Sequence, residues 1–314
     1  MAQPHNTTDI FDRSFKQIIS SLSPNAMIRF INGLFHTTHP LDSPVIHLST
    51  EHIRSNLEKR QADEVVSVAG HTYLIEEQTA DDATMAIRVF EYSYAQALKE
   101  KHIHPGLIIL PFPQAAVIYL ETSKAPPEQW EIQVVFPPDT PHSFKIQAVK
   151  LLEYTIEGIV EQGLSALLPF YMLKLRKPAR EAKSAAEREE VERAFKEVGI
   201  QVKETIEACG EREGYSDEDI VTLLERLEGL IQYIGKGYKV TEVTTMVEES
   251  LIGYGKRLAL AAEQEGLQKG LQKGLQKGLQ EGAVERQRLE QENKRLQREL
   301  AELKRIMGKD GRGH

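Results

Sequence analysis

Proline is confined to the first part of the chain, and this distribution limits the possible folds more than any other feature of the sequence. The sequence contains 14 prolines, and none occurs after Pro178. Proline inside a helix removes a hydrogen bond and clashes with the preceding turn, so only the proline-free part can be helical without interruption. We therefore expect a mixed domain over residues 1–178 and a helical remainder.

The helical remainder divides by composition into three segments. Residues 179–262 are predicted to form a helical subdomain, because Ser216 and Asp219 form a capping box ahead of an apolar run with helical spacing. Residues 263–282 form a Gly-Leu-Gln-Lys repeat that connects this subdomain to residues 283–314, a coiled coil and polar tail. The repeat is either a flexible spacer or a helix whose glycine stripe admits a close partner.

The coiled coil is predicted from a seam with alternating spacings of four and three residues. The seam consists of Leu289, Asn293, Leu296, Leu300, Leu303 and Met307. An asparagine at one a position favours a parallel, two-stranded arrangement. We therefore expect a homo-oligomer that associates through this tail.

Composition excludes several classes of protein. The single cysteine, Cys209, allows no intrachain disulfide, which favours a reducing, cytoplasmic setting. The first residues lack the pattern of a signal peptide, and we expect no membrane partner. The net charge of −8 argues against nonspecific coating of nucleic acid. The sequence also lacks the motifs of zinc hydrolases, P-loop proteins and serine hydrolases.

Residues 8–150 read as an α/β domain, with two helices, three strands, a helix and further strands. The predicted helices are 9–22, 25–35 and the crossover helix 82–99. The predicted strands are 45–48, 64–68, 72–77, a buried strand at 107–110, 115–120 and 130–136. The strands at 64–68 and 72–77 are expected to form a tight hairpin.

The length of the hairpin loop determines which acidic residues share a face of the sheet. With a loop of two or four residues, Asp63 lies opposite Glu76 or Gln78, and Glu77 points to the other face. An odd loop length would instead bring Glu77 beside Asp63. Two carboxylates and an amide on adjacent strands suit a hard cation such as Mg²⁺ or Mn²⁺. The alternative is that these residues face solvent or pair with arginine.

The segments around these acids resemble the Rpn family of recombination-promoting nucleases, the transposase-associated branch of the PD-(D/E)xK nucleases. The similar segments are LIEEQT with the following MAIRVFEYSYA, the opening DIFDRSFKQII, and the GLQKG repeats. The resemblance covers roughly residues 8–175. It implies a restriction-endonuclease-like mixed sheet flanked by helices, and a metal-dependent DNA endonuclease associated with recombination or transposition.

The resemblance also assigns roles to individual residues. Asp63 and Glu76 match the two metal-binding acids, and Gln78 stands where most of the wider superfamily has lysine. Gln78 can orient a water molecule or a ligand, but it cannot supply a positive charge. Asp9 or Asp12 matches a further acid of the first helix.

Three basic or aromatic residues are accessory candidates. Lys16 either reaches a phosphate or lies on a solvated helix face. Arg88 and Tyr92, one turn apart, are expected to clamp a phosphate and to hydrogen-bond the DNA backbone, although Arg88 could instead pair with the site's own carboxylates. The competing functional interpretation is a catalytically silent oligomer that binds DNA or protein on a nuclease scaffold.

Overall fold

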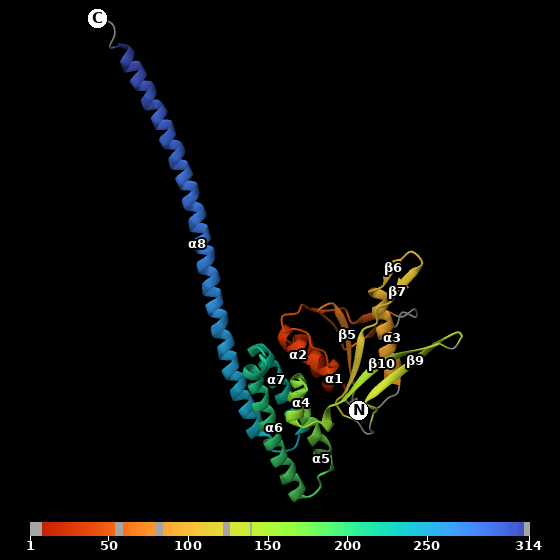
Figure 1. Cartoon of the computed structure of the whole chain (residues 1–314). Helices are drawn as coiled ribbons and strands as arrows, with labels where there is room; N and C mark the ends of the chain where they lie inside the picture. The colour runs from red at the N-terminus through yellow and green to blue at the C-terminus, as the bar shows by residue number, and fades with distance from the viewer. Residues whose placement is uncertain (1–7, 54–58, 79–83, 122–125, 139, 311–314) are drawn as a thin grey trace. The chain divides into compact units, whose positions relative to one another are not determined.

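The computed structural model describes residues 8–53, 59–78, 84–121, 126–138 and 140–310 (Figure 1). The chain divides into two compact units, Met1–Gly255 (unit 1) and Lys256–His314 (unit 2). The predicted boundary at residue 178 therefore falls inside unit 1, and the helices that follow it share a core with the sheet.

A six-stranded mixed sheet forms the centre of unit 1, in the order β1-β4-β5-β8-β10-β9. Its strands are β1 (Val45–His47), β4 (Glu64–Val68), β5 (His71–Gln78), β8 (Gln114–Tyr119), β10 (Thr140–Lys150) and β9 (Gln129–Phe136). Strands β1, β4 and β5 pair antiparallel, β5, β8 and β10 run parallel, and β9 is antiparallel to β10. Two separate ribbons are β2 (Glu51–Ile53) with β3 (Lys59–Gln61) and β6 (His102–His104) with β7 (Leu107–Ile109). The predicted mixed α/β class is confirmed.

Helices cover both faces of this sheet (Figure 1). On one face, Tyr73 and Ile75 pack with α1 (Thr8–Ser21), α2 (Pro24–Phe35) and the later helices. On the other face, Leu74 packs with α3 (Thr84–Lys99), the crossover helix. Successive residues of β5 thus enter different cores, which is the two-residue period of a strand.

Short and long helices follow the sheet. They are η1 (Leu151–Glu153), α4 (Ile156–Glu161), η2 (Ser165–Leu175), α5 (Arg176–Glu181), α6 (Ala185–Glu213) and α7 (Asp217–Ile234). The predicted capping box at the start of α7 is confirmed, because the Asp219 N–H donates to Ser216 Oγ at 3.1 Å and the Ser216 N–H donates to Asp219 Oδ2 at 2.8 Å. Asp219 also accepts a hydrogen bond from the Ser23 N–H at 2.7 Å, which ties α7 to the start of α2.

The prediction of a buried strand at Leu107 to Leu110 is wrong. Strand β7 pairs with β6 in a ribbon, and every residue from Lys101 to Ile109 is exposed. The buried parallel partner of β5 is β8. An apolar run of four residues predicts a strand but does not say whether another layer covers it.

Helix α8 (Thr241–Asp310) begins in unit 1, where Val243 and Val247 are buried. The Gly-Leu-Gln-Lys repeat lies within this helix, so the helical alternative is the observed one. Leu289, Leu296 and Leu300 are exposed, whereas the side chains of Leu303 and Met307 lie outside the described residues. Pairing of this seam with a second chain remains a prediction. Over the ranges given above, no helix is long and apolar enough to cross a bilayer.

Candidate functional site

The turn between β4 and β5 fixes the register of the acidic residues. Ala69 and Gly70 both have positive φ, at 51° and 80°, and they form a two-residue loop between Val68 and His71. Such loops match the twist of the flanking strands. Glu64 pairs with Ile75, so the next position along each strand places Asp63 opposite Glu76. The even loop length assumed in the sequence analysis is confirmed.

Asp63 connects the two acidic residues of β5 through hydrogen bonds. The Asp63 N–H donates to Glu76 Oε1 at 3.2 Å, and the Glu77 N–H donates to Asp63 Oδ2 at 2.7 Å. Asp63 lies one residue before β4, where the regular ladder has ended. Its carboxylate therefore occupies the place of a strand partner and holds the end of β5.

Helix α1 adds a lysine and a fourth acid. Lys16 Nζ lies 2.9 Å from Asp12 Oδ1 and 3.0 Å from Asp63 Oδ1. Asp12 and Lys16 are one helical turn apart, so they meet on the same face of α1. We call Asp12, Asp63, Glu76 and Glu77 the acidic cluster. Lys16 is the cation that forms ion pairs with two members of this cluster, Asp12 and Asp63.

Burial of the acidic cluster changes its electrostatics. The side chain of Asp63 is only 8% exposed, and Glu76 and Glu77 are 5% and 6% exposed. Burial, followed by the charge of Asp63, raises the pKa of Glu76 well above its ordinary value. The same two causes raise the pKa of Glu77 to about 8. Burial also raises the pKa of Asp63, against the opposing hydrogen bond from Glu77 and the charge of Lys16.

Glu77 belongs to the acidic cluster, although the sequence analysis did not include it among the site residues. Strand alternation does place it on the face opposite to Glu76. On that face, however, the charges of Asp63 and Asp12 raise the pKa of Glu77, and the charge of Lys16 lowers it. Glu77 Oε1 is buried and has no hydrogen-bond partner within the described residues. The acidic cluster thus includes residues from both faces of β5 at the end of the strand. The sequence feature that could have indicated this is the position of Glu77 next to the last residue of β5.

The remaining candidates lie at different depths. Gln78, the last residue of β5, is half-buried, and its carbonyl accepts the Leu120 N–H at 3.0 Å. On α3, Arg88 is half-buried, its charge lowers the pKa of Glu76, and its buried Nε has no hydrogen-bond partner within the described residues. Tyr92 is 7% exposed and packs in the core beneath α3. Asp9 lies in α1, but its side chain is outside the described residues.

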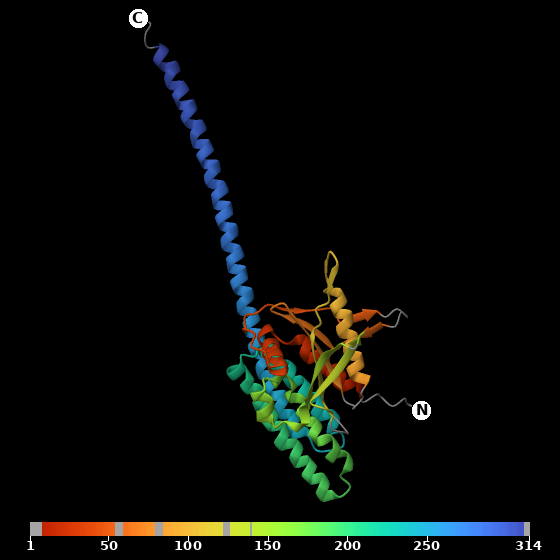
Figure 2. The same ribbon diagram turned by 45° about the vertical axis from the view of Figure 1, so that its right-hand side comes forward.

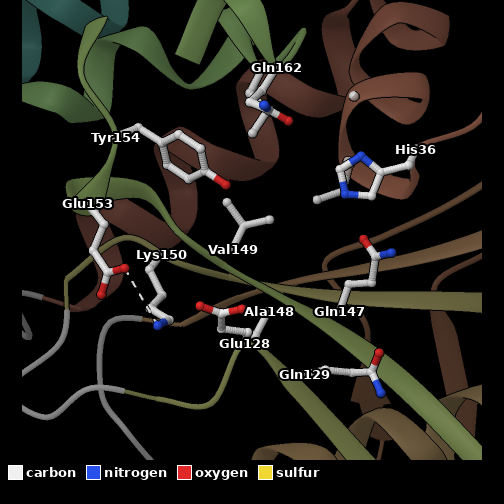
Figure 3. Close-up of a pocket in the computed structure, with 13 residues that line it drawn as sticks. His36, Glu128, Gln129, Gln147, Ala148, Val149, Lys150, Glu153, Tyr154 and Gln162 are labelled. Carbon is white, nitrogen blue, oxygen red and sulfur yellow. Dashed lines mark ion pairs between the residues drawn. The ribbon is translucent and has the colours of Figure 1, made fainter. Parts of the chain in front are cut away.

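A separate polar pocket of about 540 Å³ lies between α2, β10 and the segment after β10 (Figure 3). His36, Tyr154 and Gln162 contribute to its lining, and Lys150 Nζ lies 3.5 Å from Glu153 Oε2. None of the described lining residues belongs to the acidic cluster. The pocket and the cluster are therefore distinct features of unit 1.

Comparisons of the chain with models of protein families, with curated proteins and with solved structures found no match in any of the three. A functional assignment must therefore rest on the chemistry of the cluster and on the residues around it.

Proposed function

We propose that the protein is a metal-dependent endonuclease that hydrolyses DNA phosphodiester bonds at the acidic cluster. The observation that carries the proposal is the burial of three carboxylates, Asp63, Glu76 and Glu77, around the end of one strand. Like charges in a buried site repel and favour protonation, which destabilises the ionised protein. A cluster that is costly to the fold is typical of a functional site.

The donor set fits a hard divalent cation. Every acidic group of the cluster offers carboxylate oxygens, the ligands that Mg²⁺ and Mn²⁺ prefer. Glu77 Oε1 is buried without a described partner, and its pKa is raised to about 8, so a cation would relieve both conditions. Asp63 and Glu76 would hold the ion. When bound, the ion would polarise the scissile phosphate and lower the pKa of the attacking water.

Lys16 compensates for the missing lysine at position 78. Burial alone would lower its pKa, but the hydrogen bonds and charges of Asp12 and Asp63 raise it overall, so Lys16 stays charged. Its ammonium group is held beside Asp63, and the Lys16 side chain is still 37% exposed. A substrate phosphate approaching the cluster would thus meet a fixed positive charge. Gln78 would orient water or substrate through its amide.

DNA as the substrate rests on the resemblance to the Rpn family and its restriction-endonuclease-like relatives. The order of elements is compatible with that resemblance, because an antiparallel β1-β4-β5 unit is followed by the crossover helix α3 and the parallel strand β8. Association with recombination or transposition is part of the same proposal.

Nicking of supercoiled plasmid DNA tests the proposal. We expect cleavage with Mg²⁺, none with EDTA, and a loss of at least about 100-fold in Asp63→Asn and Glu76→Gln. Glu64→Gln is the matched control, because Glu64 is also a buried acid of β4 but pairs with His47 at 2.9 Å. Equal activity of the wild type and both site variants would refute the assignment. DNA binding without cleavage would favour the silent-scaffold alternative.

A further inference from the structure

The exposed side of α3 is apolar, which reverses the usual pattern of a surface helix. Along α3 the exposed positions are Thr84, Ile87, Tyr94, Leu98 and Lys99, of which three carry large apolar side chains. The buried side contains polar Ser93 and Gln96. An amphipathic helix ordinarily turns its charged residues toward water. The outer side of α3 therefore has the character of a contact surface.

The β6–β7 ribbon continues this apolar surface. It follows α3 directly and projects from the sheet (Figure 2). Ile103, Leu107, Ile108 and Ile109 are 67%, 53%, 62% and 43% exposed. Ile103 pairs with Ile108, so one face of the ribbon is wholly aliphatic at that level. A lone two-stranded ribbon is marginally stable in water, so a covering layer would stabilise it.

Phe112 joins the ribbon to α3. Its ring lies 5.7 Å from Phe90 and 6.3 Å from Tyr94 of α3, and it is itself 38% exposed. Ile103 and Ile108 lie on one side of the ribbon, whereas Leu107 and Ile109 point to the other side. We call the exposed apolar residues of α3, together with Ile103, Ile108 and Phe112, the α3–ribbon face. This face holds six of the thirteen exposed large apolar residues described in unit 1. Such clustering marks an interaction site, whereas scattered apolar residues do not.

We propose that the α3–ribbon face binds the same face of a second copy of this chain. Its residues expose about half of their surfaces, which amounts to roughly 600 Å² per partner or about 1,200 Å² in total, the lower end of the range for specific interfaces. A two-fold interface uses one patch twice, so a predominantly apolar patch is complementary to itself. The open edges of the ribbon could also pair with each other across the axis.

Nucleic acid and a charged protein suit this face poorly. From His102 to Ile109 the ribbon contains no Lys, Arg, Asp or Glu, and the two exposed lysines that precede it, Lys99 and Lys101, donate to the carbonyl oxygens of Ser49 and Leu98. Binding of DNA depends on cationic side chains that neutralise phosphates, and those are absent from this segment. The proposal is independent of the nuclease assignment, because no residue of the acidic cluster lies on the face.

Cross-linking of the full-length protein through a single introduced cysteine tests the proposal. Cys209 is buried, so Ile103→Cys would supply the reactive thiol for a short bis-maleimide. Ile46→Cys is the matched control, because Ile46 is 57% exposed on β1, an edge strand of the six-stranded sheet, to which the ribbon does not belong. We expect about tenfold more covalent dimer from Ile103→Cys, and we expect Ile108→Asp, but not Ile46→Asp, to abolish that excess.

Several outcomes would overturn the proposal. Equal dimer yields at positions 103 and 46 would mean that encounters through the tail explain the cross-link. Absence of covalent dimer at position 103 would mean that the faces do not meet. Protection of the thiol by plasmid DNA or by phospholipid vesicles, without covalent dimer, would assign the face to that partner instead. Circular dichroism of each variant confirms that it is folded.

Discussion

At the scale of single residues, few groups balance the negative charge of the acidic cluster. Asp63 receives a hydrogen bond from the Glu77 N–H and an ion pair from Lys16, whereas Glu77 Oε1 has no described partner. The removal of any one group therefore redistributes charge among the others. Predictions at this scale concern protonation, metal binding and the positive charge beside the site.

The stability of the metal-free protein should decrease as the pH rises from about 5 to about 8. Glu77 is protonated in the folded state up to its raised pKa of about 8, whereas in the unfolded chain it ionises near 4.5. The folded state thus binds more protons across this window, and stability is lost as the proton leaves. Glu77→Gln should flatten the decrease, measured as thermal midpoints in EDTA.

Glu249→Gln, at an exposed position of α8, is the control for this measurement. A decrease of the same size in the wild type and in Glu77→Gln would contradict the assignment of the raised pKa to Glu77.

Mg²⁺ should stabilise the wild type against unfolding. A ligand that binds only the folded state at ten times its Kd adds about 1.4 kcal/mol, or a few degrees in Tm. Asp63→Asn should lose this response because it removes a charged ligand, while the control Glu64→Gln keeps it. A Mg²⁺ response that Asp63→Asn retains in full would place the cation elsewhere, whatever the nuclease assay shows.

Lys16→Met should reduce cleavage by about 100-fold, since preorganised charges of this kind contribute about 10²–10³ to rate. If Lys16 supplies the charge that Gln78 lacks, adding Gln78→Lys should restore part of the activity. Gln78→Lys alone should retain or increase cleavage. Collapse of activity in Gln78→Lys would instead indicate that the Gln78 carbonyl oxygen contacts the metal.

At the scale of secondary-structure elements, α2 packs closely against the segment after α4, on the face of the sheet that α1 also covers. A Cβ added at Gly33 would lie 1.9 Å from the Gln162 carbonyl oxygen, so the backbones touch there. The acidic cluster depends on this layer because α1, which carries Lys16, packs in the same core.

Gly33→Ala should destabilise the protein by about 2 kcal/mol or more, because the contact is with backbone that cannot rotate away. Gly229→Ala is the matched control in a helix, since a Cβ there meets nothing within 4 Å. That change should stabilise α7 by up to about 1 kcal/mol. Urea unfolding of both variants checks the prediction, and equal effects would refute the packing argument.

At the scale of the whole molecule, the tail should govern self-association together with the α3–ribbon face. Deletion of residues 283–314 should weaken dimerisation at least about tenfold, because the heptad seam is lost. Leu296→Glu should act in the same direction, whereas Gln297→Glu, one position off the seam, should not. Sedimentation equilibrium measures the three variants, and equal effects of the two point substitutions would contradict pairing through the seam.

The sequence by itself determined the local features of this protein. Capping residues act over a few positions and located the start of α7. Hairpin parity limited the residue opposite Asp63 to Glu76 or Gln78 for an even loop, and the structure shows that it is Glu76. The repeat left two conformations open, and the structure places it within α8.

Only the tertiary structure decided what covers each element. Strand β10 lies between β8 and β9, the ribbon at 102–109 is exposed, and Glu77 joins the cluster from the other face of the sheet. Each of these depends on contacts between segments far apart in the chain, and the local hydrophobic pattern is compatible with either outcome. Burial and charge at the site likewise arise when α1 meets the end of β5, which no single segment encodes.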